Sequence, residues 1–201
     1  IWKPGRLQYM YDFLEKYERE KPVIYFANGV MGWGAVYREF SSFDEFVKNL
    51  GIYGTWTTGV GIWKEDFDRI PKDYQYDKIS PHAGILYSER KKNKYIINDL
   101  YWMSEPDTDQ KKKGKYDLYK AFAVDEFIIT INLYRDGDIS IDTLKTVKES
   151  FREFLKTLYC DFNLREIPCS YDLAGFEDYI GIFFNKEDIV EGAKLKYLGK
   201  K

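Results

Sequence analysis

Hydrophobic and polar residues follow two different periods along the first quarter of the chain. Apolar residues recur three and four positions apart over residues 5–19, which predicts an amphipathic helix. Two short apolar runs, 23–26 and 35–40, flank a glycine-rich stretch and predict two strands joined as a hairpin. Ser42, followed three residues later by Glu45, is a capping-box pattern and predicts a short helix after the second strand.

The middle of the chain is richer in glycine and charged residues. Small and large residues alternate over residues 53–63, which predicts a strand with a bulge. Residues 64–81 are irregular and are expected to form a long surface excursion. The apolar runs 85–87 and 95–97 flank a polar stretch and predict a β-hairpin with a basic tip. The proline, glycine and lysines of residues 104–115 predict an exposed, mobile loop.

The second half contains the most regular patterns. Residues 127–134 predict a strand, in which Phe127, Ile129, Ile131 and Leu133 would point to one face and the residues between them to the other. Residues 141–159 show helical spacing and predict the longest helix, with Ser140 as its N-cap. Residues 179–184 predict a final strand, and a short helix is expected to begin at Glu187.

The helix over residues 141–159 is predicted to bury a single apolar face. The residues expected on that face are Leu144, Val147, Phe151, Leu155 and Leu158. The basic residues expected outside are Lys145, Lys148, Arg152 and Lys156. This face is predicted to pack on the strand proposed for residues 127–134.

Together these elements predict an α+β fold with a mixed or antiparallel sheet and two to four packed helices. The 201 residues lie within the usual range for one domain, and the sequence shows no repeat and no linker composition, so a single domain over residues 1–201 is expected. The aromatic share of 18% predicts a core rich in tyrosine and phenylalanine.

Charge narrows the classes of partner. A formal net charge of −2 argues against coating duplex DNA by bulk electrostatics, but a local basic groove remains compatible with it. Basic residues gather in two short clusters that either bind nucleic-acid phosphates or form solvated turns. The candidates for binding are Arg90, Lys91, Lys92, Lys112 and Lys113. Abundant lysine and glutamate with little glutamine favour a heat-adapted source, although an AT-rich genome gives a similar bias.

Few residues of the chain are typical metal ligands or nucleophiles. Cys160, Cys169 and the single histidine, His82, do not complete a structural zinc site. Two reduced thiols in a cytoplasmic protein are favoured over a disulfide, and His82 is expected in a loop rather than in catalysis. No apolar run reaches the roughly 18 residues of a membrane span, and the first residues lack a signal-peptide layout. No membrane partner is expected.

Two short segments resemble nuclease motifs. Asp73 or Asp77, followed by an apolar run and by residues 89–91 (Glu-Arg-Lys), has the order of acidic and basic residues seen in metal-dependent nucleases of the restriction-enzyme type. Residues 173–181 resemble the signature helix of the LAGLIDADG homing endonucleases, with Ile180 in the place of the metal-binding acid. A charged turn is the favoured explanation of the first segment.

A broader resemblance concerns the order of elements. Residues 37–46, followed by the segment 53–60, resemble the approach to the active site in the small subunits of archaeo-eukaryotic primases. Residues 125–132 resemble the metal-binding strand of that family, in which two acids lie two residues apart. Thr130 and Asn132 stand at those two places. The resemblance implies a nucleic-acid-associated, primase- or polymerase-like domain acting in replication, either active or catalytically inactive.

An active form would require other metal ligands. Asp136 and Asp138 continue the same side of the proposed strand and are the candidate catalytic residues, with Asp172 or Asp178 as a further donor to Mg²⁺. A turn at Gly137 is the favoured alternative, in which the two carboxylates only satisfy backbone N–H groups. No metal site and no cofactor are therefore expected, and magnesium is implied only if the domain is active.

Two functions remain open from the sequence. The first is the nucleic-acid-associated domain just described, with basic residues on phosphates and exposed tryptophan or tyrosine stacking on bases of a single strand. The second is a non-enzymatic protein-binding module, such as an immunity or inhibitor protein, in which aromatic residues anchor a protein partner.

Overall fold

The computed structural model describes residues 3–56, 59–74, 80–103 and 116–199 of the chain. The described residues form two compact units, unit 1 (Ile1–Asp107) and unit 2 (Thr108–Lys201), and each is described by itself. The chain has an α+β fold, as predicted, with more helices than the two to four expected. The prediction of one domain over residues 1–201 stays a prediction.

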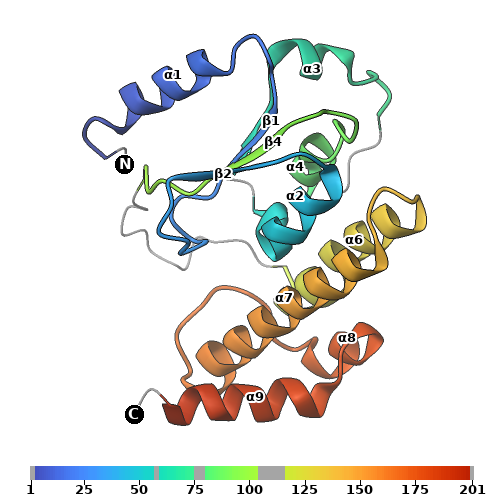
Figure 1. Cartoon of the computed structure of the whole chain (residues 1–201). Helices are drawn as coiled ribbons and strands as arrows, with labels where there is room; N and C mark the ends of the chain where they lie inside the picture. The colour runs from blue at the N-terminus through green and yellow to red at the C-terminus, as the bar shows by residue number, and fades with distance from the viewer. Residues whose placement is uncertain (1–2, 57–58, 75–79, 104–115, 200–201) are drawn as a thin grey trace. The chain divides into compact units, whose positions relative to one another are not determined.

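Unit 1 contains a mixed four-stranded sheet (Figure 1). Its strands are β1 (Val23–Phe26), β2 (Tyr37–Phe40), β3 (Val60–Gly61) and β4 (Tyr95–Asn98). The order across the sheet is β2-β4-β1-β3, and the two central strands, β1 and β4, run parallel. The two edge strands, β2 and β3, are antiparallel to their neighbours. The mixed sheet that the sequence allowed is therefore confirmed.

Helices cover both faces of this sheet. The helices of unit 1 are α1 (Arg6–Lys16), α2 (Phe43–Leu50), α3 (Lys64–Arg69) and α4 (Pro81–Leu86), with a 3₁₀ turn η1 over Gly51–Thr55. Figure 1 shows α1 on one side of the strands and α2 and α4 on the other. Toward α1 the sheet buries one cluster, formed by Phe13, Tyr17, Ile24 and Ile96. On the opposite face, Tyr95 packs against Phe43 and Phe46, with ring centroids 5.8 and 5.3 Å away.

Unit 2 is helical. Its elements are α5 (Leu118–Lys120), the π-helical turn η4 (Ala121–Asp125), α6 (Glu126–Arg135), α7 (Ile141–Tyr159), the π-helical turn η5 (Cys160–Leu164), α8 (Phe176–Phe183) and α9 (Lys186–Gly199). Phe127 of α6 lies at the centre of an aromatic cluster, with ring centroids 5.4 Å from Phe151 of α7 and 5.5 and 5.2 Å from Phe183 and Phe184. These edge-on contacts join three helices in one core.

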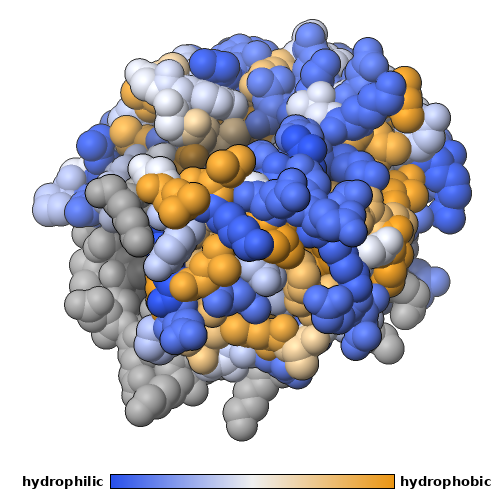
Figure 2. All heavy atoms as spheres, turned by 90° about the horizontal axis from the view of Figure 1, so that it is seen from below, coloured by the Kyte–Doolittle hydropathy of each residue, from blue (hydrophilic) through white to orange (hydrophobic). Residues whose placement is uncertain are grey.

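Single apolar residues are exposed on the last two helices of unit 2. Ile182 of α8 and Leu195 and Leu198 of α9 are all more than half exposed. Figure 2, which views the molecule from below, shows hydrophobic residues interrupted by hydrophilic ones on this side. Scattered exposed apolar residues are normal on a folded protein, so this face alone identifies no binding site.

Several local predictions are confirmed. Helix α1 lies within the predicted range 5–19, and α2 begins as the capping pattern requires, with the Ser42 hydroxyl accepting from the backbone N–H of Glu45 at 3.2 Å. Helix α7 spans the predicted residues 141–159, and the Ser140 hydroxyl accepts from the backbone N–H of Thr143 at 3.2 Å. A hydroxyl at the N-cap satisfies a donor that the first helical turn leaves free.

The predicted strand over residues 127–134 is wrong, because these residues form most of α6. Apolar residues occupy both sides of the alternating pattern, so the run is also compatible with a helix. The buried positions Glu126, Phe127, Thr130 and Leu133 have helical spacing. The predicted final strand over residues 179–184 is wrong for the same reason, since it falls mainly in α8.

Both predicted hairpins are also wrong. Strand β4 lies between β1 and β2, so the runs 23–26 and 35–40 do not pair with each other. The run 85–87 does not form a strand, because its first two residues lie in α4, which has a proline in its first turn. The segment 53–63 contains part of the turn η1 and the short strand β3. The surface excursion expected for 64–81 includes α3.

Lys156 was expected on the solvent-exposed side of α7, outside its apolar face, but this expectation is wrong. The residue is only 7% exposed. Its ammonium lies 2.9 Å from Glu153 and 3.5 Å from Asp188 of α9. Its stem packs on α9 at Gly192, where a Cβ would come within 2.6 Å of the lysine. The mobile loop expected at residues 104–115 lies outside the described residues.

Phe151 should be one of the most sensitive positions of unit 2, because its side chain is fully buried against Phe127. We expect Phe151→Ala to lower the free energy of unfolding by about 3–5 kcal/mol, since it removes buried contacts and leaves a cavity. The exposed Ile141, also on α7, provides the control. Ile141→Ala should change stability by less than about 0.5 kcal/mol. Equal effects in urea denaturation would contradict this packing.

Candidate functional site

Part of the basic cluster at residues 90–94 is neutralised within unit 1. The ammonium of Lys92 lies 2.7 Å from Asp66, and the lysine side chain is only 17% exposed. The ammonium of Lys94 lies 2.5 Å from Glu20 and 3.6 Å from Glu39. Acids of the same fold therefore compensate Lys92, one of the charges that the sequence assigned to phosphate binding, and its neighbour Lys94.

The other residues of this cluster differ in their surroundings. Arg90 donates from Nε to the carbonyl oxygen of Tyr87 at 2.8 Å. Lys91 is exposed and has no ion-pair partner among the residues that the structure describes. A hollow of about 420 Å³ is lined by Glu20, Pro22, Lys91, Lys92, Asn93 and Lys94. Lys112 and Lys113 lie outside the described residues. Lys91 is thus a predicted phosphate ligand whose charge no acid among the described residues neutralises.

An arginine and a tryptophan form a more distinctive arrangement at the edge strand β2. Arg38 lies between Tyr37 and Glu39, whose side chains both face α1. Because successive side chains of a strand point to opposite faces, the Arg38 side chain lies on the other face of the sheet. Its guanidinium carbon lies 4.3 Å from the centre of the Trp33 ring. Phe40 meets the same ring at a centroid distance of 6.4 Å and an interplanar angle of 65°. We call this arrangement the Arg38–Trp33 platform.

The backbone around Trp33 explains how the ring reaches this position. Gly32 and Gly34 flank the tryptophan with φ angles of 64° and 67°, which side-chain-bearing residues rarely adopt. Asp99, which follows β4, holds the same loop at two places. Its carboxylate accepts from the backbone N–H of Met31 at 3.0 Å, and its own N–H donates to the carbonyl oxygen of Val36 at 2.7 Å. Asp99 therefore acts as a positioning residue for the platform.

Asn98, the last residue of β4, and Asn28, which follows β1, complete this anchoring. Because the two strands are parallel, their carboxyl ends lie at the same edge of the sheet. The Asn28 side chain accepts from the backbone N–H of Trp102 at 2.8 Å, and the Asn98 side chain accepts from that of Leu100 at 3.1 Å. The Asn98 amide nitrogen and the Trp102 indole nitrogen are buried without a partner among the described residues. These side chains shape the loops beside the platform.

The platform presents a cationic plane to solvent. Arg38 is exposed, and no carboxylate among the described residues pairs with it. A guanidinium that lies over an aromatic ring without an acid partner keeps N–H donors available for a base or a phosphate. Sequence reasoning anticipated exposed aromatic residues for stacking but did not identify this pair. The glycines on both sides of Trp33 and the alternation along β2 were the available signal.

The candidate catalytic acids Asp136 and Asp138 lie in the turn between α6 and α7. The backbone N–H groups of these two residues donate to the carbonyl oxygens of Asn132 and Leu133, each at 2.9 Å, and Gly137 has a φ of 80°. Because residues 127–134 are helical, the two acids do not continue a side of a strand, and that argument for a shared metal site is wrong. Among the described residues, no group of three or more acidic, histidine or cysteine side chains could hold a metal ion.

The other sequence candidates fall on different elements. Residues 89–91 follow helix α4 instead of a strand, and Asp77 lies outside the described residues. Helix α8 begins at Phe176, inside the segment 173–181. His82 lies in α4 rather than in a loop, with Nε2 against the carbonyl oxygen of Thr55.

Cys160 is buried, Cys169 is partly buried, and neither thiol takes part in a disulfide. Within the part of the chain that the structure describes, no helix has the length and apolar character needed to cross a membrane.

Glu39 should make the stability of unit 1 sensitive to acid. Its carboxylate accepts from the Tyr17 hydroxyl at 2.5 Å. This hydrogen bond, with a smaller contribution from the charge of Lys94, lowers the pKa of Glu39. A depressed folded-state pKa stabilises the protein above the unfolded pKa, and this contribution is lost as the pH falls through the folded value. Between about pH 5 and 3, we expect the melting temperature of Glu39→Gln to fall less steeply than that of the wild type. An equally steep fall of the melting temperature with pH in both proteins would contradict the stabilising role of the Glu39 carboxylate.

Asp136 and Asp138 allow a direct test of the metal hypothesis. We expect titration with magnesium or manganese to give no saturable heat, because both acids lie in a helix-connecting turn without a third acid arranged beside them among the described residues. Saturable binding that disappears in the Asp136→Ala, Asp138→Ala double variant would show that the acids converge on a cation.

Comparison with protein-family models, with curated proteins and with solved structures found no match to this chain. The resemblance to the primase small subunits therefore stays a hypothesis drawn from the sequence. One segment on which it depends, 125–132, lies mainly in helix α6, where the family pattern requires a strand. The geometry of the chain's own residues has to carry any functional argument.

Proposed function

We propose that this protein binds single-stranded nucleic acid through unit 1, with the Arg38–Trp33 platform contacting a base and the adjacent phosphate. The observation that carries the proposal is the exposed guanidinium held 4.3 Å from the Trp33 ring centre without a carboxylate partner among the described residues. An arginine at a protein surface is commonly paired with an acid or solvated freely. Here the guanidinium instead lies over an aromatic ring.

The chemistry of the platform fits an unpaired base better than a duplex. A single strand can turn a base outward, so that the base stacks on the guanidinium plane or on the exposed part of the indole. The N–H groups of Arg38 are then available to a neighbouring phosphate. Duplex binding depends more strongly on a broad basic face, and the net charge of −2 does not favour it.

This proposal concerns binding and not synthesis. A primase- or polymerase-like reaction would require acids that hold a divalent cation near the nucleotide. Thr130 and Asn132, the residues aligned with the acids of the primase family, lie on helix α6. The primase-like form, and with it a role in replication, is therefore proposed only as a catalytically inactive relative that retains nucleic-acid binding.

A second candidate function is supported by another surface. Leu7 and Tyr11 of α1 are large apolar side chains that are more than half exposed on the same side of the helix. Exposed aromatic residues commonly anchor protein partners. This favours a non-enzymatic protein-binding module, such as an immunity or inhibitor protein, as the alternative.

The platform can be tested by fluorescence anisotropy with a labelled oligothymidine. Trp33→Ala should weaken binding about tenfold, because a stacked base contributes about 1–3 kcal/mol. Arg38→Ala should weaken binding and reduce the slope of log affinity against log salt by about 0.7, the value for a single contact to a single strand.

Arg19→Ala is the matched control, because Arg19 is an exposed arginine without an acid partner among the described residues. It should leave the affinity within about twofold of the wild type, since non-specific attraction changes little with a single distant charge. Circular dichroism should show that all three variants remain folded. Loss of affinity in Arg19→Ala equal to that in Arg38→Ala, or wild-type affinity in Trp33→Ala, would contradict the proposal.

A further inference from the structure

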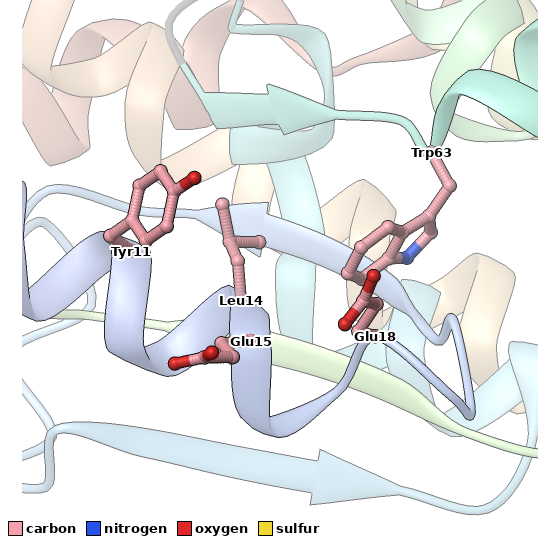
Figure 3. A pocket seen from close by; sticks show the side chains of 5 residues that line it. All are labelled: Tyr11, Leu14, Glu15, Glu18 and Trp63. Carbon is pink, nitrogen blue, oxygen red and sulfur yellow. The ribbon is translucent and has the colours of Figure 1, made fainter.

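A groove beside α1 combines apolar walls with an acidic rim. Tyr11, Leu14 and Trp63 line a hollow of about 380 Å³ together with Glu15 and Glu18 (Figure 3). Figure 3 shows Tyr11 and Leu14 rising from α1 toward the side where Trp63 descends from the segment after β3. We call this hollow the α1 groove.

The floor of the α1 groove is fixed by the core of unit 1. Leu14 and Trp63 both pack against the cluster that contains Phe13 and Ile24. The indole nitrogen of Trp63 donates to the carbonyl oxygen of Pro22 at 2.7 Å, which sets the orientation of the ring. The apolar floor is therefore present before any partner binds, and little side-chain ordering is needed there.

The upper part of the groove remains available for contact. Tyr11 is 69% exposed, although it is one of the large aromatic side chains of the protein. Glu15 and Glu18 are exposed, and neither has a cationic partner among the described residues. Glu20, which lies just beyond them in the sequence, is instead paired with Lys94. The rim thus carries two carboxylates that no cation of the described part of unit 1 pairs with.

We propose that the α1 groove docks a segment of a protein partner in which a large apolar side chain is flanked by lysine or arginine. The apolar side chain would enter the space between Tyr11 and Trp63, and the basic groups would meet Glu15 and Glu18. An aromatic anchor surrounded by complementary charge is a common arrangement at protein interfaces. The rim carboxylates repel phosphate, so the groove does not extend a nucleic-acid path.

This surface is independent of the Arg38–Trp33 platform. The platform arginine lies on the face of the sheet opposite to α1, since its neighbours Tyr37 and Glu39 face that helix. The inference therefore does not rest on nucleic-acid binding. A variant of either surface should leave the activity of the other unchanged, which allows the two proposals to fail separately.

The test uses the full chain and three fluorescein-labelled synthetic peptides of equal length. The first has a central leucine flanked by arginines, the second has the same leucine flanked by glutamates, and the third has a central glycine flanked by arginines. We expect saturable anisotropy changes with the first peptide and at least tenfold weaker binding with the other two. Increasing salt should weaken the first interaction, because exposed charges are screened.

Three protein variants locate the binding. Tyr11→Ala should weaken the first peptide at least tenfold, and the Glu15→Gln, Glu18→Gln double variant should weaken it about threefold to tenfold, as expected for two exposed ion pairs. The double variant Glu187→Gln, Glu191→Gln removes two exposed charges from α9 and should leave the affinity unchanged. The control reports any effect of net charge alone.

Several outcomes would overturn the inference. Failure of the first peptide to bind, or equal binding of the arginine- and glutamate-flanked peptides, would exclude the proposed partner chemistry. Unchanged affinity in Tyr11→Ala would place the contact elsewhere. Light scattering that detects a dimer of the wild type but a monomer of Tyr11→Ala would show that a second copy of this chain occupies the groove instead. Melting temperatures of the variants close to that of the wild type would exclude unfolding as the cause.

Discussion

The parallel pairing of β1 with β4 is the contact on which the rest of unit 1 depends. All four residues of β4 and the first three of β1 are buried, so these two strands require cover on both faces. Apolar side chains that alternate along them meet α1 on one side and α2 on the other. The pairing therefore decides where both helices lie, and it leaves β2 at an edge of the sheet.

Both proposed surfaces follow from this arrangement. Since β2 is an edge strand, Arg38 can leave the sheet surface and meet Trp33 from the loop before it. Asp99, directly after β4, holds that loop through one hydrogen bond of its carboxylate and one of its backbone N–H. On the other face, the packing of α1 on the central strands turns Tyr11 outward beside Trp63. A nucleic-acid contact and a protein contact can therefore coexist in one small unit without competing for the same residues.

The sequence predicted those elements whose formation depends on neighbouring residues alone. The hydroxyl caps at Ser42 and Ser140 and the helical spacing over residues 141–159 were sufficient for α2 and α7. The strand order was not predictable in this way, because β4 is distant in sequence from the strands that it separates. Residues 127–134 show the limit of periodicity, since an apolar run on both sides of a strand pattern also fits a buried helix. The Arg38–Trp33 pair depends on tertiary packing and could not be located from residue types alone.

Photo-crosslinking locates the nucleic-acid contact most directly. A single-stranded oligonucleotide that carries iodouracil can be irradiated in complex with the full chain, and the modified peptide can be identified by mass spectrometry. The proposed platform predicts the principal adduct at Trp33, because the base would lie against its ring or against the guanidinium over it. Adducts confined to unit 2, with Trp33 unmodified at saturating oligonucleotide, would contradict the account.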